Sequence, residues 1–316
     1  MHKINKNKII VIAIFIFIFI GLIFRNLHLS SVPFYDWDEG MYAQIAKEII
    51  NNKSIFTTFN GQVWLDKPPL VHIFIAGIFL LFGQSEFWAR MGMIIFSFIL
   101  LILTYKSAKK LYSIISSSKI NPTEELFASL IPMLILAASP VFMDRSALLN
   151  SDTAIAIGWM GYLLYQDQYW LKLFFLTLGV WSKSVLGLYP LCIDAGLTLF
   201  RKIIFYKPKK QRFNIQTIFS QGLKIFILLL LPSLWYIAGL LKYGQSFIYN
   251  HFQSQVLKRI SVPIELHVGN KFYYISYLWE KMGLVNILFI IGYILFFINI
   301  SIQIFKEKKK FFNQKI

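Results

Sequence analysis

The chain has 316 residues, of which 57% are hydrophobic and 15% are charged, and its mean hydropathy is +0.59. Soluble domains average about a quarter charged residues, so this composition excludes an ordinary soluble enzyme or binding module. The net charge of +17 does not favour nucleic-acid binding, because the lysines and arginines stand between apolar runs and not on one polar surface. Such interleaving is typical of the cytoplasmic loops of a polytopic membrane protein.

Apolar runs recur along the whole chain and predict an all-α, polytopic transmembrane helical bundle of eight or nine membrane segments. The runs from Ile9 to Phe24 and from Phe226 to Leu241 are apolar on all sides, as is typical of helices in lipid. A full crossing needs about 20 residues, with about 17 as a lower limit, so some shorter runs are expected to cross only half-way. The predicted segments are 9–25, 69–83, 91–105, 126–143, 147–165, 170–183, 185–200, 218–241 and 284–304.

The lysines around these runs predict the topology. Those before Ile9 and those in the basic tail 305–316 place both ends of the chain in the cytoplasm. Segments 26–68 and 242–283 then form two outer loops, and the Asn150–Asp152 segment lies on the same face. We therefore expect an integral protein of the inner or plasma membrane, with its polar loops towards the periplasm or exterior.

One part of this topology is inconsistent. If the basic segments 106–119 and 201–216 are both inside, four crossings fit between them. Two full crossings at 69–83 and 91–105 would instead put 106–119 outside. One of these two runs is therefore expected to be re-entrant or tilted.

The chain shows no internal repeat and no linker, so residues 1–316 are predicted to form a single module. Cys192 is the only cysteine, which excludes an intrachain disulfide.

The first outer loop, 26–68, is the predicted catalytic loop, and its middle has the pattern of an amphipathic helix. Apolar side chains recur there every three to four residues, with polar ones on the other side. Such a helix can lie in the membrane interface. The apolar set is Met41, Tyr42, Ile45, Ala46, Ile49 and Ile50, and the polar set is Glu39, Gln44, Lys47 and Glu48.

Three acids stand at the start of this helix. Asp36 and Glu39 have the spacing of a capping box, which explains both without a catalytic role. Asp38 is left without a structural task, since an acid in the first turn stabilises a helix by only ~0.3–1 kcal/mol. Asp38 is therefore the principal candidate for chemistry.

The loop closes on Asp66-Lys67-Pro68-Pro69, whose prolines predict the start of a helix. Asp66 and Lys67 could form a surface ion pair of little energetic value. Alternatively, both lie at the mouth of the bundle beside Asp38. A cation fixed there, at the level of the headgroups, suits a phosphate.

A second polar place runs from Arg145 to Asp152 between two apolar runs. Asp152 could simply cap the next helix, and Arg145 could anchor lipid headgroups. Lys183 lies between apolar runs, and an ionisable residue at membrane depth is a functional candidate by default.

The second outer loop carries His251, Arg259, His267 and Tyr273. A single histidine in a loop is usually not a metal ligand, and the spacing here is not that of a compact zinc motif. Two histidines with carboxylates on one membrane face keep a divalent metal open as an alternative.

Taken in order, these motifs resemble the GT-C superfamily of membrane glycosyltransferases, in the branch of protein O-mannosyltransferases and lipid A aminoarabinose transferases. No single motif is specific, and the order over nearly the whole chain carries the resemblance. The motifs are Asp38-Glu39-x-x-Tyr42, Leu65-Asp66-Lys67-Pro68-Pro69, Ser85 to Arg90, Arg145 to Asp152, Trp181-Ser182-Lys183-Ser184, and His251-Phe252-Gln253 followed by Arg259, His267, Gly269 and Tyr273-Tyr274.

The resemblance implies an inverting sugar transfer from a polyprenyl-phosphate-linked donor to a hydroxyl on the outer face of the membrane. It implies that Asp38 is the general base and that Lys67 and Arg259 bind the donor phosphate. It makes Asp66 and His251 candidate metal ligands. Weaker candidates are Glu39 and Asp152 (or Asn150) as acids, Lys183 and Arg145 for phosphate, and Tyr42, His267 and Tyr273 elsewhere in the site.

Two departures from the family pattern affect these expectations. Ser184 stands where the family usually has glycine. The sequence also ends soon after residue 304, whereas many relatives carry further helices or a C-terminal domain. The acceptor therefore stays open.

The chemistry is sensible on physical grounds as well. A lipid-phosphate leaving group needs no nucleotide-binding domain, and the sequence has neither a GxGxxG motif nor a P-loop. Two other functions remain as alternatives: a flippase or transporter of lipid-linked sugars, and a non-catalytic subunit of a cell-envelope assembly.

Overall fold

The computed structural model describes the backbone of residues 6–35, 38–116, 120–204, 215–258, 272–283, 285–295 and 298. It forms two compact units, 1–138 with 142–264 and 139–141 with 265–316. Helices dominate the described residues of both units, which confirms the predicted all-α fold. The predictions made for Asp36, Arg259, His267 and the tail 305–316 lie outside the described residues.

The first half of the larger unit holds two long helices with shorter elements between them. A two-residue antiparallel hairpin, with Thr58 opposite Val63, joins two of the helices. The elements are α1 (Lys6–Leu29), α2 (Asp38–Asn52), β1 (Thr58–Phe59), β2 (Gln62–Val63), α3 (Leu70–Phe82) and α4 (Glu86–Ile115).

The regular elements described in the second half of the larger unit are all helices, and the smaller unit adds α13 (Tyr273–Met282) and a helix over Val285–Leu295. The elements of the second half are α5 (Pro122–Ala138), α6 (Pro140–Arg145), α7 (Asp152–Leu164), α8 (Tyr169–Lys183), the 3₁₀ helix η1 (Ser184–Leu188), α9 (Tyr189–Ile204), α10 (Ile215–Tyr243), α11 (Gln245–Phe247) and the π-helix η2 (Ile248–Leu257).

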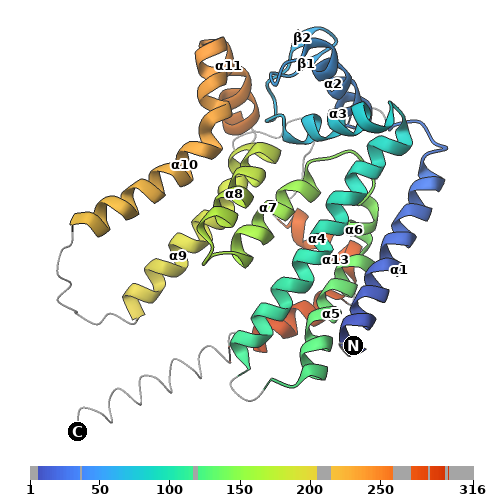
Figure 1. Cartoon of the computed structure of the whole chain (residues 1–316), viewed down its shortest axis with the longest axis vertical. Helices are drawn as coiled ribbons and strands as arrows, with labels where there is room; N and C mark the ends of the chain where they lie inside the picture. The colour runs from blue at the N-terminus through green and yellow to red at the C-terminus, as the bar shows by residue number, and fades with distance from the viewer. Residues whose placement is uncertain are drawn as a thin grey trace, which may run out of the picture. The chain divides into compact units, whose positions relative to one another are not determined.

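Polar contacts define one end of the larger unit, which we call the lysine end because Lys106, Lys109 and Lys110 lie there at the end of α4. The Lys110 ammonium donates to the carbonyl of Leu164, at the end of α7, over 2.7 Å. The Asn7 amide, near the start of α1, donates to the carbonyl of Pro122, at the start of α5, over 3.2 Å. The termini of four helices therefore meet at this end (Figure 1).

The opposite end, called the site end, is defined in the same way. The Asn26 amide near the end of α1 donates to the carbonyl of Phe87 at the start of α4, over 3.1 Å. The Arg25 guanidinium donates to the Ser146 hydroxyl just after α6, over 2.7 Å. Figure 1 shows α2, the hairpin and α3 at this end as well. The lysines at the end of α4 and the acids at the start of α2 thus lie at opposite ends of this unit.

The inconsistent part of the predicted topology is explained by α3. With 13 residues it is about 20 Å long, too short for a bilayer core of about 30 Å. It begins after Pro69 and ends at Gly83, whose φ of 91° stops the helix. With 30 residues, about 45 Å, α4 is long enough to cross alone. By length, the 69–83 run is therefore the one expected to be re-entrant or tilted, and the end of α4 lies at the lysine end.

Among the described residues, four helical stretches have the length and hydropathy of a membrane crossing: Lys6–Leu29, Glu86–Ile115, Tyr169–Phe200, which folds back on itself, and Ser220–Tyr243; a fifth is added if α13 and the helix after it form one span. These make the chain an integral membrane protein. The predicted number of eight or nine segments stays a prediction.

The Tyr169–Phe200 stretch is a hairpin, because the chain reverses at Ser184. Lys172 pairs with Asp194 at 2.6 Å, and the backbone at Gly187 lies against Gly179. A Cβ on Gly187 would come within 2.2 Å of the Val180 nitrogen, so only glycine allows this approach.

Three predicted segment boundaries were wrong. The 126–143 run is interrupted at Ser139, between α5 and α6. The next residue, Pro140, has no backbone N–H and so cannot donate the hydrogen bond that would continue α5. The 147–165 run becomes helical only at Asp152, because residues 146–151 form an irregular connection. The 185–200 run opens with the 3₁₀ turn η1.

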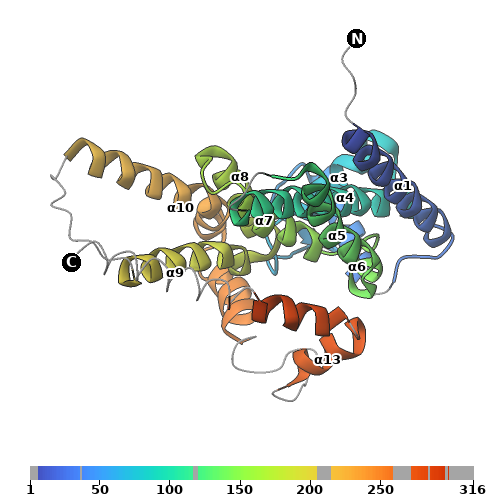
Figure 2. The same cartoon turned by 90° about the horizontal axis from the view of Figure 1, so that it is seen from below.

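The core of the larger unit lies between α4 and its neighbours, which pack side by side when seen from below (Figure 2). Met93, Ile94 and Leu101 of α4 are completely buried, as are Met133 of α5 and Leu176 of α8. This packing fixes the positions of the helix termini at the site end, and these termini carry the polar residues.

The amphipathic helix is confirmed as α2, but the expected separation into an apolar and a polar side is wrong. Glu39 and Glu48 are buried together with Tyr42, Ile45 and Ala46. Buried carboxylates are tolerated only with partners, and both glutamates have them.

Glu48 anchors the hairpin. Its carboxylate accepts hydrogen bonds from Gln44, from the Thr58 hydroxyl, and from the backbone amides of Asn60 at 2.7 Å and Gly61 at 3.3 Å. Burial raises the pKa of Glu48, but these four hydrogen bonds lower it by more, so the pKa lies below its usual value of 4.5. Its contribution to stability is therefore present above pH 4.5 and is lost as the pH falls through the folded-state pKa.

We expect Glu48→Gln to loosen the hairpin at neutral pH, since the amide cannot reproduce the charge-assisted bonds. Hydrogen exchange of a peptide covering 54–64 should become faster in the variant, and wild type should approach it on acidification below about pH 4.5. Glu280→Gln is the control, because the Glu280 side chain is 74% exposed. Equal exchange in wild type and Glu48→Gln at neutral pH would contradict the anchoring role.

Candidate functional site at one end of the bundle

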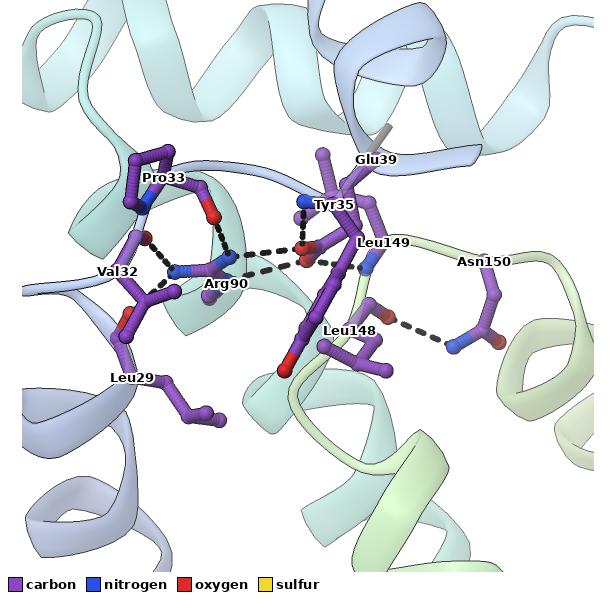
Figure 3. A network of polar contacts seen from close by, with 9 residues as sticks. All are labelled: Leu29, Val32, Pro33, Tyr35, Glu39, Arg90, Leu148, Leu149 and Asn150. Carbon is purple, nitrogen blue, oxygen red and sulfur yellow. Dashed lines mark hydrogen bonds and ion pairs between the residues drawn. The ribbon is translucent and has the colours of Figure 1, made fainter. Parts of the chain in front are cut away.

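A buried ion pair organises the start of α2. Arg90 of α4 is completely buried and holds Glu39 in a two-pronged contact, Nη2 to Oε2 at 2.7 Å and Nε to Oε1 at 3.1 Å. The same guanidinium donates to the carbonyls of Leu29, Val32 and Pro33 (Figure 3). One arginine thus fixes the chain between α1 and α2.

The Glu39 carboxylate also reaches a third segment. Its Oε1 accepts from the amide of Leu149 at 3.2 Å, and its Oε2 accepts from the amide of Tyr35 at 3.1 Å (Figure 3). Asn150 stiffens the same connection by donating to the Leu148 carbonyl at 2.7 Å. Because both oxygens are used in this way, the contacts of Glu39 are those of a structural anchor and not of a free base.

Asp38 is the first residue of α2 and is exposed. Within the described part of the chain its carboxylate makes no hydrogen bond or ion pair, and residues 36–37 are not described. The carboxylate next to the anchored Glu39 is therefore open to an incoming group.

Lys67 lies against α2 and contacts Tyr42, which is one helical turn after Asp38. Its ammonium donates to the Tyr42 hydroxyl at 3.1 Å, and Tyr42 is 1% exposed. The Tyr42 ring stacks on the ring of His72 with centroids 4.5 Å apart. His72 is also 1% exposed, and neither of its ring nitrogens has a hydrogen-bond partner among the described residues.

Two candidates proposed separately are paired in space. Lys183, at the end of α8, forms an ion pair with Asp152, at the start of α7, and both side chains are more than a third exposed. The predicted capping role of Asp152 is wrong, because Ser151 is the N-cap and Asp152 the first helical residue. The amide of Asp152 instead donates to Asn150 at 2.9 Å.

His251 in η2 is completely buried and connects two segments. Its Nδ1 lies 2.7 Å from the carbonyl oxygen of Leu65, and its Nε2 lies 2.8 Å from the Ser184 hydroxyl. The Tyr236 hydroxyl of α10 donates to the same Ser184 oxygen at 3.1 Å. Burial lowers the pKa of His251 by more than the bond to Leu65 raises it, so the ring is neutral at neutral pH.

These contacts close into a circuit. Each link is a hydrogen bond, an ion pair or a short stretch of chain, so five segments distant in sequence are held around one place. The circuit runs through Glu39, Tyr42, Lys67, Leu65, His251, Ser184, Lys183, Asp152, Asn150 and Leu149 and returns to Glu39.

Two further predicted site residues have other surroundings. Arg145 is exposed, and its backbone carbonyl accepts from the Asn150 amide at 3.0 Å. Tyr273 belongs to the smaller unit, where it is 48% exposed and packs against Tyr274 and Tyr277. The predicted roles of both residues stay predictions.

The described residues do not fit the candidate metal site. No group of three or more histidine, cysteine or acidic side chains among them could hold a metal ion. Both nitrogens of His251 already face protein oxygens, so a metal there would have to displace Ser184. Asp66 is half-buried and has interactions of its own.

Sequence reasoning missed the roles of Arg90, His72, Ser184 and Tyr236. A signal existed for the first two, since each is an ionisable residue at the edge of or inside an apolar run. For Ser184 the sequence showed only that it replaces the glycine usual in the family, and nothing local marks Tyr236, because the role of each depends on a partner more than 50 residues away.

Comparisons with known proteins support the fold. No family model matches the sequence. An uncharacterized protein of Aquifex aeolicus (strain VF5) is 24% identical over 251 residues, which cover 76% of this chain and 45% of the relative. Two crystal structures of ArnT from Cupriavidus metallidurans are similar over 86% of this chain and 48% of ArnT. The apo state gives a TM-score of 0.64 at 13% identity, and the state bound to undecaprenyl phosphate gives 0.67 at 14%.

The chain therefore spans about half the length of the proteins it matches. At this level of identity the likeness establishes the fold alone. Within that limit, the fold expected from the resemblance is confirmed, because the chain has the fold of ArnT.

Proposed function

We propose that this chain transfers a sugar from a polyprenyl-phosphate-linked donor to a hydroxyl-bearing acceptor at the site end. The observation that carries the proposal is the closed circuit of contacts. It holds an open carboxylate, Asp38, and two cations, Lys67 and Lys183, in a fold shared with a protein that binds undecaprenyl phosphate.

The proposed step is a single displacement. The acceptor oxygen attacks the anomeric carbon while the bond from that carbon to the phosphate oxygen breaks, which inverts the configuration. Asp38 takes the hydroxyl proton, and general-base catalysis of this kind typically contributes 10²–10⁴-fold. The leaving group is the polyprenyl phosphate.

The cations act on the leaving phosphate. Lys67 is held by Tyr42, which gives its ammonium a defined position, and Lys183 is held by Asp152. Cations fixed where negative charge develops stabilise the transition state without reorganising at the moment of reaction. Exposed apolar side chains on α10, such as Leu223, Phe226 and Leu241, provide a surface that can solvate the prenyl chain.

Binding of undecaprenyl phosphate to purified protein tests the proposal directly. Lys67→Ala should weaken binding about 10- to 100-fold, because a hydrogen bond to a charged group is worth roughly 1.5–3 kcal/mol. Lys242→Ala is the matched control, since Lys242 lies over the rings of Phe56 and Tyr243, outside the circuit. Unchanged affinity in Lys67→Ala, measured by native mass spectrometry or thermophoresis, would remove Lys67 from the donor site.

We also propose that the site end faces the exterior and the lysine end the cytoplasm, following the positive-inside rule. In a Cys192→Ser background, Asn60→Cys should react with a membrane-impermeant maleimide in intact cells. Gln166→Cys, in the loop after α7, should react only after permeabilisation. Both positions are exposed, so identical labelling of the two would contradict the orientation.

A further inference from the structure

Ser184 adopts a backbone conformation that serine rarely takes. Its φ is 59° and its ψ is −143°, at the point where α8 ends and the chain reverses into η1. This region is essentially confined to glycine, because a Cβ clashes with the neighbouring backbone. A glycine at this position would relieve the strain. The contribution that serine makes and glycine cannot is its hydroxyl group.

The Ser184 hydroxyl lies between two partners, and only one arrangement of protons satisfies both. The Leu65 carbonyl can only accept, so His251 carries its proton on Nδ1 and its Nε2 is an acceptor. Ser184 therefore donates to Nε2 and accepts from the Tyr236 hydroxyl. The result is a one-way chain of three hydrogen bonds from Tyr236 through Ser184 and His251 to Leu65.

This chain of bonds joins the two segments that carry the candidate phosphate cations. Leu65 lies two residues before Lys67, and Ser184 directly follows Lys183. The other route around the circuit between the same two lysines is long, passing through α2, Glu39, Leu149 and Asp152. If the Ser184–His251 hydrogen bond were removed, the segments of Lys67 and Lys183 would be connected within the circuit only by this longer series of contacts.

We propose that Ser184 is a positioning residue that sets the separation of Lys183 from Lys67 through the His251 ring. The His251 ring is suited to this task because it is buried in an aromatic cage of Trp235, Tyr236, Phe247 and Phe252 and cannot turn freely. The effect of this spacing on a donor phosphate rests on the proposed function, whereas the spacing itself does not.

The test separates the hydroxyl from the backbone. Ser184→Gly removes the hydroxyl and the strain together, whereas Ser184→Ala removes only the hydroxyl. Spin labels at Ile55→Cys and Leu186→Cys in the Cys192→Ser background report on the two segments. Both sites are exposed, at 51% and 54%.

We expect a narrow distance distribution in wild type and a broadened or shifted one in both variants. The thermal midpoint should be maintained or raised in Ser184→Gly and lowered in Ser184→Ala. Affinity for undecaprenyl phosphate should fall about tenfold in both. A purely structural role for Ser184 would instead make affinity follow the thermal midpoint. Tyr236→Phe keeps the Ser184–His251 bond and should broaden the distribution less.

Two outcomes would overturn the inference. The first is an unchanged distance distribution in Ser184→Gly, and the second is a loss of affinity that occurs only where the midpoint is lowered. Should wild-type protein not bind undecaprenyl phosphate at all, the proposed function fails, and the distance measurement still decides whether Ser184 positions the two segments.

Discussion

Asp38→Asn should lower the turnover number by about 10²- to 10⁴-fold, the range that general-base catalysis usually contributes. The amide has the size of the carboxylate and similar hydrogen-bonding capacity, but it cannot take a proton at neutral pH. Asp38 is exposed and lies outside the buried Glu39–Arg90 network, so the substitution should leave folding and donor affinity near wild type. Turnover would be measured with purified protein, a verified polyprenyl-linked donor and a hydroxyl acceptor.

The neighbouring acid Asp36 is the matched control. Asp36→Asn makes the same chemical change two residues away, and asparagine caps a helix as well as aspartate does, so turnover should change little. If Asp38→Asn turns over near the wild-type rate, Asp38 is not the base. Asp152 would be the next candidate, with its ion pair to Lys183 as the feature to examine.

Arg90→Ala should destabilise the protein by about 3–5 kcal/mol, because it leaves the buried Glu39 carboxylate without its cation. The loss also removes the donors to three backbone carbonyls between α1 and α2. We expect a markedly lower thermal midpoint in detergent and faster hydrogen exchange in residues 29–35. Arg90→Lys should restore only part of this, because an ammonium cannot form the two-pronged contact.

A double-mutant cycle separates this charge effect from simple loss of packing. Arg90→Met with Glu39→Gln removes both charges and keeps most of the volume, so it should be more stable than Arg90→Met alone, which leaves the Glu39 charge buried and unpaired. If Arg90→Ala unfolds within about 1 kcal/mol of wild type, well below the penalty expected for an unpaired buried charge, the ion pair does not organise the site end.

The sequence alone was sufficient for the membrane class and the helical fold. Apolar length and the distribution of lysines are properties of local stretches, and they need no knowledge of packing. The helix α2 and the start of α3 after Pro69 were predicted for the same reason, since periodicity and proline act on the nearest turn. Asp38, Lys67, Asp152, Lys183 and His251 were all singled out before any of their contacts were known.

Only the tertiary structure decided which of these residues meet and which are structural. Glu39 and Arg90 are 51 residues apart, Asp152 and Lys183 are 31 apart, and Ser184 and His251 are 67 apart. Whether such pairs form depends on how α4, α7, α8 and η2 pack, and that depends on close approaches such as the one between Gly179 and Gly187. The sequence likewise left the length of α3 open, because that length is set by its ends at Pro69 and Gly83. Hydrophobic pattern specifies each helix by itself, whereas contacts between distant helices specify the site.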